Sequence, residues 1–181
     1  MTSINPFRII VLTSCTGAKR HMPTNALTKS DFENVHDPDQ LARREAELAE
    51  MRLSAEMMYT GEQHEYLMRG VNRFRAQFRD ESLALKIVSA GYGLIDGLNF
   101  IVPYECTFQG MRNAEIESWS EHLQIPTDTR SLFEKDADLV IVLLGEGYLR
   151  ALRLDSSINF AAPTLFFTSE SNVAVVPDHA R

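Results

Sequence analysis

The residues best suited to chemistry form the loop Ser14-Cys15-Thr16-Gly17-Ala18-Lys19-Arg20, which directly follows an apolar run. Small residues in this loop would let backbone N–H groups face an anion, and Lys19 and Arg20 add positive charge. Such a loop suits a phosphate, a carboxylate or a nucleobase carbonyl. An ordinary polar turn is the alternative, because short motifs are weakly specific. Four loop residues are the expected substrate contacts: Ser14, Thr16, Gly17 and Arg20.

The loop departs from two phosphate-binding loops of known geometry. A Walker loop needs Gly-x-x-x-x-Gly-Lys-Ser/Thr, of which only Gly17 and Lys19 are present. A cysteine phosphatase places its Cys and Arg one position further apart than Cys15 and Arg20, and has Ser or Thr where His21 stands. The missing residue disrupts a cradle in which successive amides must wrap a phosphate.

Lys19 and Cys15 are the first candidates for catalysis. Lys19 can serve as an electrophile, an amine nucleophile or an anion clamp. Cys15 can act as a nucleophile, because nearby cations favour a thiolate. A buried structural thiol is the alternative for Cys15, since free cysteines are commonly buried.

A second group of candidates lies in the segment Ser89-Ala90-Gly91-Tyr92-Gly93-Leu94. Its two glycines allow a tight turn and a close approach of the backbone to a ligand. Tyr92 or Tyr104 could stack on a base, because aromatic faces do so without strong sequence demands. Packing of these rings over the end of a sheet is the alternative. We take Tyr92 as a candidate catalytic residue and assign four others to substrate binding: Ser89, Gly91, Gly93 and Tyr104.

Two further positions complete the candidate substrate-binding set. Tyr59 lies between two predicted helices, with His64 in the first turn of the second, and both side chains could either reach a pocket or pack in the core. Glu146 opens another helix, where it could act in a cleft or simply favour the positive helix start. The histidines and cysteines form no Cys-x-x-Cys or His-Glu-x-x-His pattern, so we expect neither a metal nor a cofactor.

Four apolar runs predict the strands that must position these residues. They are short, rich in β-branched residues and nearly continuous, which is typical of strands buried on both faces. A fifth, short edge strand is expected at 173–176, whereas 21–36 and 95–110 look like loops, the first with a short helix near 29–34. The four runs are residues 7–13, 85–89, 138–144 and 163–168.

Helices are predicted between these strands. Asp37 caps the first, which continues to about Tyr59, and Thr60 and Gln63 match a capping box at the start of the second. The second helix ends near residue 79. Shorter helices are expected at 113–123, 127–135 and 148–154.

The alternation of strands and helices predicts a three-layer α/β fold, Rossmann-like or uracil-DNA-glycosylase-like. Its sheet would be mainly parallel, with four or five strands and helices on both faces. In such sheets ligands bind outside the carboxyl ends of the strands. The candidate segments near residues 14–20, 89–94, 145–148 and 168–170 all follow strands, so we expect the site at that edge.

Composition places the chain among globular proteins. Its 181 residues, 44% hydrophobic and 24% charged, suit one domain, 1–181, that needs no disulfide or structural metal. Two cysteines and apolar runs far shorter than the roughly 18 to 20 residues of a membrane helix predict a cytoplasmic protein without membrane contact. The net charge of −7 disfavours a broad nucleic-acid surface and leaves room for a local basic pocket.

Several motifs resemble those of a group of small, uncharacterised bacterial and phage proteins described as domains of unknown function. Ser14-Cys15-Thr16-x-x-Lys19 is similar to the Ser-Cys-Ser-x-x-Lys start of that group. Ser89–Leu94 matches its Ser-Ala-x-Tyr-Gly-Leu segment, Tyr59-Thr60 its Tyr-small step, and Pro103-Tyr104-Glu105 its Pro-Tyr-Asp pair. The resemblance covers about two thirds of the chain, in the same order.

The same layout resembles the core domain of archaeosine synthase, which modifies a 7-deazaguanine base in transfer RNA. The lysine of that family lies four residues after a cysteine, as Lys19 follows Cys15. The family's Tyr and His elements lie farther away here, at Tyr59 and His64, across a long insertion. The resemblance implies an α/β domain with a pocket of nucleobase or nucleotide size.

Three functions follow from these observations. The first is an enzyme acting on a nucleotide or modified nucleobase, such as a transferase or a glycosidase, with a small-molecule ligand as its main partner. The second is a non-catalytic nucleotide sensor of a bacterial or phage conflict system. The third is a protein-interaction module that presents a Met-rich helix containing Met51, Met57 and Met58, since methionine surfaces adapt to partners.

Overall fold

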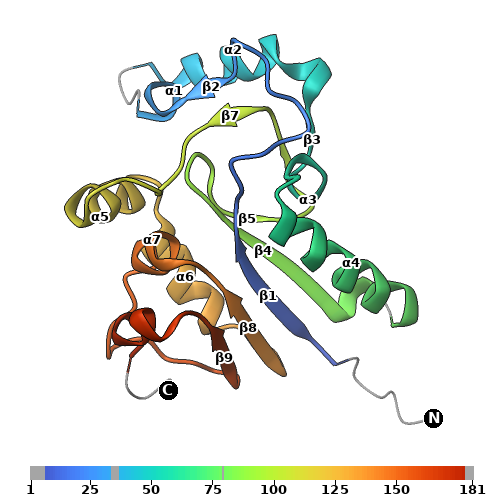
Figure 1. Cartoon of the computed structure of the whole chain (residues 1–181), viewed down its shortest axis with the longest axis vertical. Coiled ribbons are helices and arrows are strands. Elements are labelled where there is room, and N and C mark those ends of the chain that lie inside the picture. The colour runs from blue at the N-terminus through green and yellow to red at the C-terminus, as the bar shows by residue number, and fades with distance from the viewer. Residues whose placement is uncertain (1–6, 34–36, 79, 178–181) are drawn as a thin grey trace.

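The centre of the molecule is a five-stranded sheet with the strand order β5-β4-β1-β8-β9 (Figure 1). This computed structural model describes residues 7–33, 37–78 and 80–177. The four strands β4, β1, β8 and β9 run parallel, and β5 pairs antiparallel with β4. The prediction of a three-layer fold around a mainly parallel sheet is therefore confirmed. The strands are β1 (Ile9–Ser14), β4 (Leu83–Ser89), β5 (Gly93–Asp96), β8 (Leu139–Leu143) and β9 (Thr164–Phe167).

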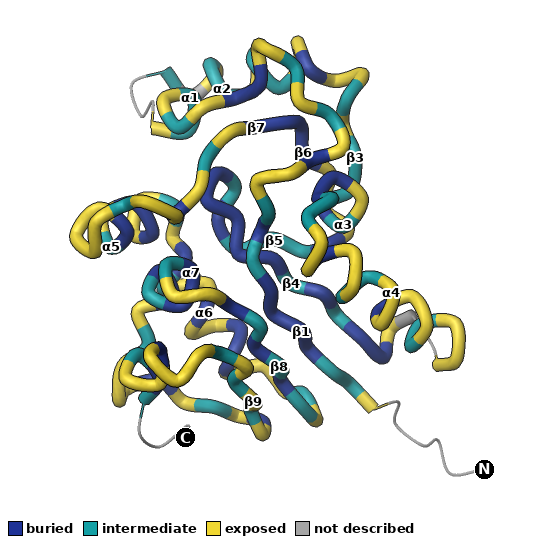
Figure 2. The backbone as a smooth tube through the Cα atoms, viewed as in Figure 1, coloured by how far each residue is buried: buried dark blue, intermediate teal, exposed yellow. Residues whose placement is uncertain are grey.

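The middle strands form the core because both of their faces are covered. Leu12 of β1 and Leu85, Ile87 and Val88 of β4 are completely buried, and both strands are mostly dark blue in Figure 2. Continuous apolar runs are what a strand buried on both faces requires. The same runs made these strands predictable from sequence.

Helices cover both faces of the sheet. Helix α4 (Glu62–Gln77) connects β1 to β4 and packs on β4. Helices α5 (Asn113–His122), α6 (Ile125–Phe133) and α7 (Glu146–Ala151) follow, and α5 packs against the other two. The crossovers from β1 to β4 and from β8 to β9 run in opposite directions, so right-handed connections place α4 and α7 on opposite faces (Figure 1).

The face of β8 and β9 on the α4 side is only partly covered. Leu143 pairs in register with Phe167, and both line a hollow together with Leu67 of α4. Leu165 and Phe167 of β9 are exposed, and the strand alternates teal and yellow in Figure 2. Parallel sheets normally have both faces covered, and this bare half-face departs from that rule.

The long helix expected at 37–59 is wrong. The chain there forms α2 (Pro38–Glu47), a 3₁₀ turn at Ala49–Met51, the short strand β3 (Leu53–Ser54) and α3 (Ala55–Met58). Strand β3 pairs antiparallel with β6 (Phe100–Ile101), and this long-range pairing overrides local helix propensity. The break places Met51 in the 3₁₀ turn and the other two methionines in α3, where Met58 is fully buried and Met57 is 51% exposed.

The segments expected as loops carry structure of their own. Residues 95–110 contain the end of β5, β6, and β7 (Tyr104–Glu105). Residues 21–33 contain β2 (Leu27–Thr28) and α1 (Lys29–Glu33), and α1 is the short helix expected near 29–34. Strands β2 and β7 pair in parallel. The rest of the predicted loop, residues 34–36, lies outside the described residues.

Two further local predictions, an edge strand and a helix cap, are also wrong. The expected edge strand at 173–176 is a 3₁₀ helix, Glu170–Val175, and the fifth strand of the sheet is β5. The expected capping box at Thr60 and Gln63 does not form, because α4 begins at Glu62 with Gly61 as its N-cap. The backbone N–H of Thr60 instead donates to the carbonyl of Ala18, 3.1 Å away.

Candidate functional site

The loop after β1 is fastened to two neighbouring segments. The Cys15 N–H donates to the carbonyl of Val88 in β4 at 2.9 Å. The Arg20 N–H donates to the carbonyl of Met58 at 2.8 Å, and Lys19 forms a β-bridge with Tyr59. Tertiary pairing therefore brings Lys19 beside Tyr59, although 39 residues lie between them by number.

The Lys19 side chain points inward and is buried, with 7% of the residue exposed. Its Nζ lies 4.3 Å from the centroid of the Tyr104 ring and 6.0 Å from that of Tyr59. It donates to the carbonyls of Thr16 and Gly17 at 3.2 and 3.4 Å. Burial lowers the pKa of Lys19, and Coulombic attraction to the acidic groups of Cys15, Glu105 and Cys106 opposes that shift. Cation–π contact and carbonyl oxygens thus replace a carboxylate partner.

A chain of hydroxyl groups lies beside the lysine. The Tyr104 hydroxyl shares hydrogen bonds with Tyr59 at 2.8 Å and with Ser89 Oγ at 2.7 Å. Both tyrosines are almost completely buried, and burial raises their pKa values well above the usual range. The phenols therefore stay protonated at neutral pH and can each donate a hydrogen bond.

Cys15 belongs to the same buried cluster. Its Sγ lies 3.1 Å from the hydroxyl of Tyr148, which is also 3.4 Å from Thr107 Oγ1. Burial raises the pKa of Tyr148, so this phenol too remains protonated. Cys106 directly precedes Thr107 in the sequence, and burial raises the pKa of its thiol. We call Cys15, Lys19, Tyr59, Ser89, Tyr104 and Tyr148 the lysine cluster.

Tyr92 lies at the margin of this cluster. Its hydroxyl donates to Glu45 Oε1 at 2.9 Å, and its ring meets those of Phe32 and Tyr104 edge to face, with centroids 5.1 and 5.4 Å apart. Burial raises its pKa, as for the other tyrosines. Tyr92 therefore packs on the aromatic core and bonds to Glu45. The hydrogen bonds of Lys19 Nζ go to Thr16 and Gly17 and do not include Tyr92.

Gly91 and Gly93, in the same segment as Tyr92, are each required for a different steric reason. A Cβ at Gly91 would lie 2.8 Å from the Phe32 ring and 3.0 Å from that of Tyr104. Gly93 has a φ of +74°, and a Cβ there would lie 2.7 Å from the carbonyl oxygen of Leu123. Both glycines allow close packing of protein against the turn, which explains them without a ligand.

The remaining candidates lie on the outside. Thr16 Oγ1 donates to the carbonyl of Ala18 at 2.8 Å and accepts from the Gly61 N–H at 3.3 Å, so it braces the loop. Gly17 and Arg20 are exposed, and Ser14 is half-buried. Glu146 is exposed at the start of α7 and pairs with Arg150 at 3.8 Å. The ion pair of Glu146 is therefore with Arg150, which is not part of the lysine cluster.

His64 is an additional buried polar group next to the cluster. Its ring meets that of Tyr59 edge to face, with centroids 5.6 Å apart, and its Nε2 lies 3.0 Å from the carbonyl oxygen of Glu56. Its Nδ1 has no hydrogen-bond partner among the residues described. Burial lowers the pKa of His64, so the ring is neutral at pH 7.

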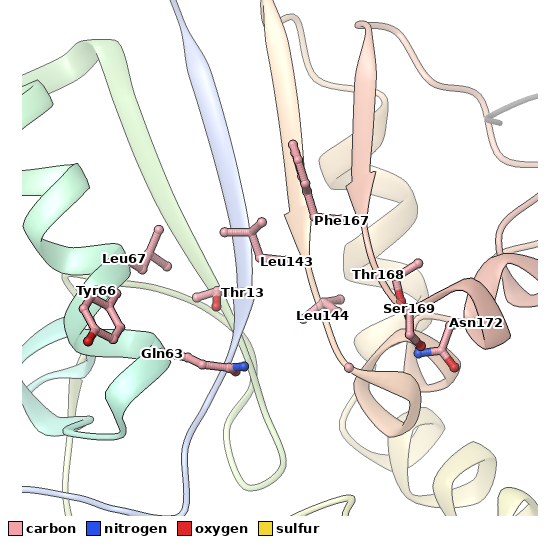
Figure 3. Close-up of a pocket in the computed structure, with 11 residues that line it drawn as sticks. Thr13, Gln63, Tyr66, Leu67, Leu143, Leu144, Phe167, Thr168, Ser169 and Asn172 are labelled. Atoms are coloured by element: carbon pink, nitrogen blue, oxygen red, sulfur yellow. Dashed lines mark hydrogen bonds between the residues drawn. The ribbon is translucent and has the colours of Figure 1, made fainter.

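A groove of about 660 Å³ lies on the bare half-face at the carboxyl ends of β1, β8 and β9 (Figure 3). From β1 the strand order runs one way to β4 and the other way to β8, so the groove lies at the switch point where α/β sheets bind ligands. Helix α4 forms the opposite wall. The lining residues are Thr13, Gln63, Tyr66, Leu67, Leu143, Leu144, Gly145, Phe167, Thr168, Ser169 and Asn172.

Most of these lining residues were not expected from sequence. Gln63, Tyr66 and Asn172 lie in helical segments, where polar or aromatic residues usually face solvent. The sequence carries no local signal for the groove, because Leu165, Phe166 and Phe167 form a continuous apolar run, and only the structure shows that Leu165 and Phe167 are exposed. The groove meets the predicted segments only at Gly145, Thr168 and Ser169.

Among the described residues, no group of three or more His, Cys, Asp or Glu side chains could hold a metal ion. No helix in the described ranges is both long and apolar enough to cross a bilayer.

A family model for a family of unknown function (DUF6884) matches residues 45–165, which is more than half of the chain. The chain belongs to this family. The DUF6884 match begins in α2 and ends in β9, so it contains Tyr59, Ser89 and Tyr104, whereas Lys19 precedes it. A search of functionally described proteins finds no match to the chain.

Proposed function

We propose that this DUF6884 protein is an enzyme that binds a nucleotide or modified nucleobase at the carboxyl edge of its sheet and acts on it through Lys19. The observation that carries the proposal is the buried Lys19 ammonium group, which has no carboxylate within ion-pair distance among the described residues. Burying a charge without an opposite charge is costly. Buried groups with a shifted pKa, as Lys19 has, concentrate at functional sites.

The surroundings of Lys19 favour proton transfer or nucleophilic attack. A lowered pKa increases the fraction of neutral amine at physiological pH, and a neutral amine is the form that can accept a proton or attack carbon. The protonated phenols of Tyr59 and Tyr104 supply hydrogen-bond donors beside it. The carbonyls of Thr16 and Gly17 cover Nζ, so this segment must move before a substrate atom can reach the amine.

A nucleobase is the ligand class that three features support. The site lies at a sheet switch point, where nucleotides bind in many α/β proteins. The groove at the same edge of the sheet offers aromatic rings and neutral hydrogen-bonding groups. The sequence motifs around Lys19 resemble the core of archaeosine synthase, an enzyme of base modification. Transfer or hydrolysis at a glycosidic bond is the reaction class we favour.

The test compares Lys19→Met with Lys135→Met in turnover of nucleosides, nucleotides and transfer RNA, followed by chromatography. Methionine keeps the apolar stem of Lys19 and removes the amine, while Lys135 is an exposed lysine on another surface. We expect wild type and Lys135→Met to form product, and Lys19→Met to be slower by about 100-fold or more. Equal rates in all three proteins would contradict a role for Lys19.

A non-catalytic sensor is the second candidate, and the closed bonding of the lysine cluster favours it. Tyr59, Tyr104 and Ser89 satisfy one another, and Cys15 bonds to Tyr148, so these groups can stabilise the fold without chemistry. A ligand that binds tightly and is recovered unchanged after long incubation would support this function. Formation of any product would exclude it.

A further inference from the structure

We propose that the groove between α4 and the bare face of β8 and β9 binds an uncharged planar heterocycle, namely the base of a nucleoside. This inference rests on the proposed function for the ligand class, and it assigns the base to residues that the lysine cluster does not include. The groove volume of about 660 Å³ lies within the range of about 300–1,000 Å³ that is usual for small-molecule sites.

The two walls of the groove present aromatic rings. Tyr66 projects from α4 and Phe167 from β9, on opposite sides of the hollow, as Figure 3 shows. Tyr66 is 59% and Phe167 is 60% exposed, although side chains of this size usually bury most of their surface. Exposed rings that face a shared hollow can stack on the faces of a base. The floor between them is apolar, formed by Leu67 and Leu143.

Polar groups lie at one end of the groove, where a base edge would meet them. The Asn172 side chain is buried, with 6% exposed, and its Nδ2 donates to Thr168 Oγ1 at 3.1 Å. This bond fixes the amide and leaves Oδ1 without a donor among the described residues. Gln63 points toward the groove from α4 (Figure 3), and its amide bonds to no described residue. An amide offers a donor and an acceptor side by side, which is the pattern that base edges match.

The charges around the groove select against phosphate. None of the described residues that line it is charged. Arg69 is not one of the lining residues, and its guanidinium carbon lies 5.0 Å from the centroid of the Tyr66 ring, where it supports that ring. A phosphate in the groove would lose hydration without gaining a cation, so the free base or nucleoside should bind at least as tightly as the nucleotide.

The experiment measures binding by calorimetry, with the four common bases, their nucleosides, 5′-monophosphates and inorganic phosphate as probes. Four variants of the full chain are compared with wild type: Gln63→Leu, Phe167→Ala, Gln77→Leu and Phe100→Ala. Gln77 lies on the same helix as Gln63 but outside the groove lining, and Phe100 is 70% exposed on another segment. Because Phe167 is exposed, its removal leaves the core packing intact.

We expect at least one base or nucleoside to bind wild type, and Gln63→Leu and Phe167→Ala each to weaken that binding about tenfold or more. The two control variants should bind like wild type, and phosphate alone should not bind. Unchanged affinity in Gln63→Leu and Phe167→Ala would overturn the groove assignment, as would a lack of binding by every base and nucleoside.

Lys19→Met separates this inference from the proposed function. If groove variants bind normally while Lys19→Met loses turnover, the groove assignment fails and the enzymatic proposal stands. If groove variants lose affinity while Lys19→Met turns over like wild type, the base site stands and the role of Lys19 fails.

Discussion

Lys19 combines an ammonium group with almost complete burial, and its aliphatic stem and its charge have opposite requirements. The ring of Tyr104 and two backbone carbonyls stabilise the charge, and burial still lowers its pKa from the usual 10.5. In the pH window between the folded pKa and 10.5, the unfolded chain binds the proton and the folded chain does not. The free energy of unfolding contributed by Lys19 therefore rises with pH across that window.

The stability of wild type relative to Lys19→Met should thus increase between pH 7 and pH 10. Urea unfolding of both proteins across this range measures the difference, and subtraction removes the contributions of tyrosines and thiols that they share. A difference that stays constant or decreases with pH would show that Lys19 keeps an ordinary or a raised pKa.

His64 should make stability depend on pH in the acidic range. Burial lowers its pKa below 6.5, so acid protonates the unfolded chain first, and stability falls as pH drops from about 6.5 toward the folded pKa. The loss amounts to about 1.4 kcal/mol for each unit of pKa difference.

His64→Gln keeps a side-chain donor for the Glu56 carbonyl and removes the titration. Wild type should lose stability relative to His64→Gln between pH 7 and pH 5, measured by urea unfolding. His21→Gln, a change in the loop before β2, should follow wild type. A flat difference between wild type and His64→Gln would contradict the buried neutral imidazole.

At the scale of elements, the turn between β4 and β5 depends on a glycine. Gly93→Ala would force a side chain into a left-handed backbone, which costs about 1–2 kcal/mol, and place its Cβ 2.7 Å from the Leu123 carbonyl oxygen. Gly110 also has a positive φ of +81°, with nothing within 4 Å of an added Cβ.

Gly93→Ala should therefore destabilise the protein more than Gly110→Ala, by about 1 kcal/mol or more, in thermal or urea unfolding. Equal losses would mean that Leu123, the C-cap residue of α5, adjusts freely, and that the turn does not depend on this contact.

The strands of the central sheet were predictable and several other elements were not, for a physical reason. Strands such as β8 can be recognised by a continuous apolar run, which is a local property of the sequence. Strand β3 exists because Leu53 pairs with Ile101, and Cys15 meets Tyr148 across 133 positions. Such long-range pairings leave no local signal.

The same reason limits what sequence reveals of the site. The motifs singled out Lys19, Tyr59, Ser89 and Tyr104, and the structure brings these four side chains together. The groove was missed because Gln63, Tyr66 and Asn172 look like ordinary surface residues until β9 places Phe167 opposite α4. Sheet topology, rather than any motif, makes them neighbours.

At the scale of the whole molecule, the account requires that a base-containing ligand binds the folded chain. A thermal-shift screen of wild type against bases, nucleosides, nucleotides and inorganic phosphate tests this most directly, because a ligand of the folded state raises the melting temperature. At a concentration of about 100 times Kd we expect one base-containing class to raise Tm by roughly 5–10 °C, with no shift from phosphate. The absence of a shift with every base-containing compound would contradict the account.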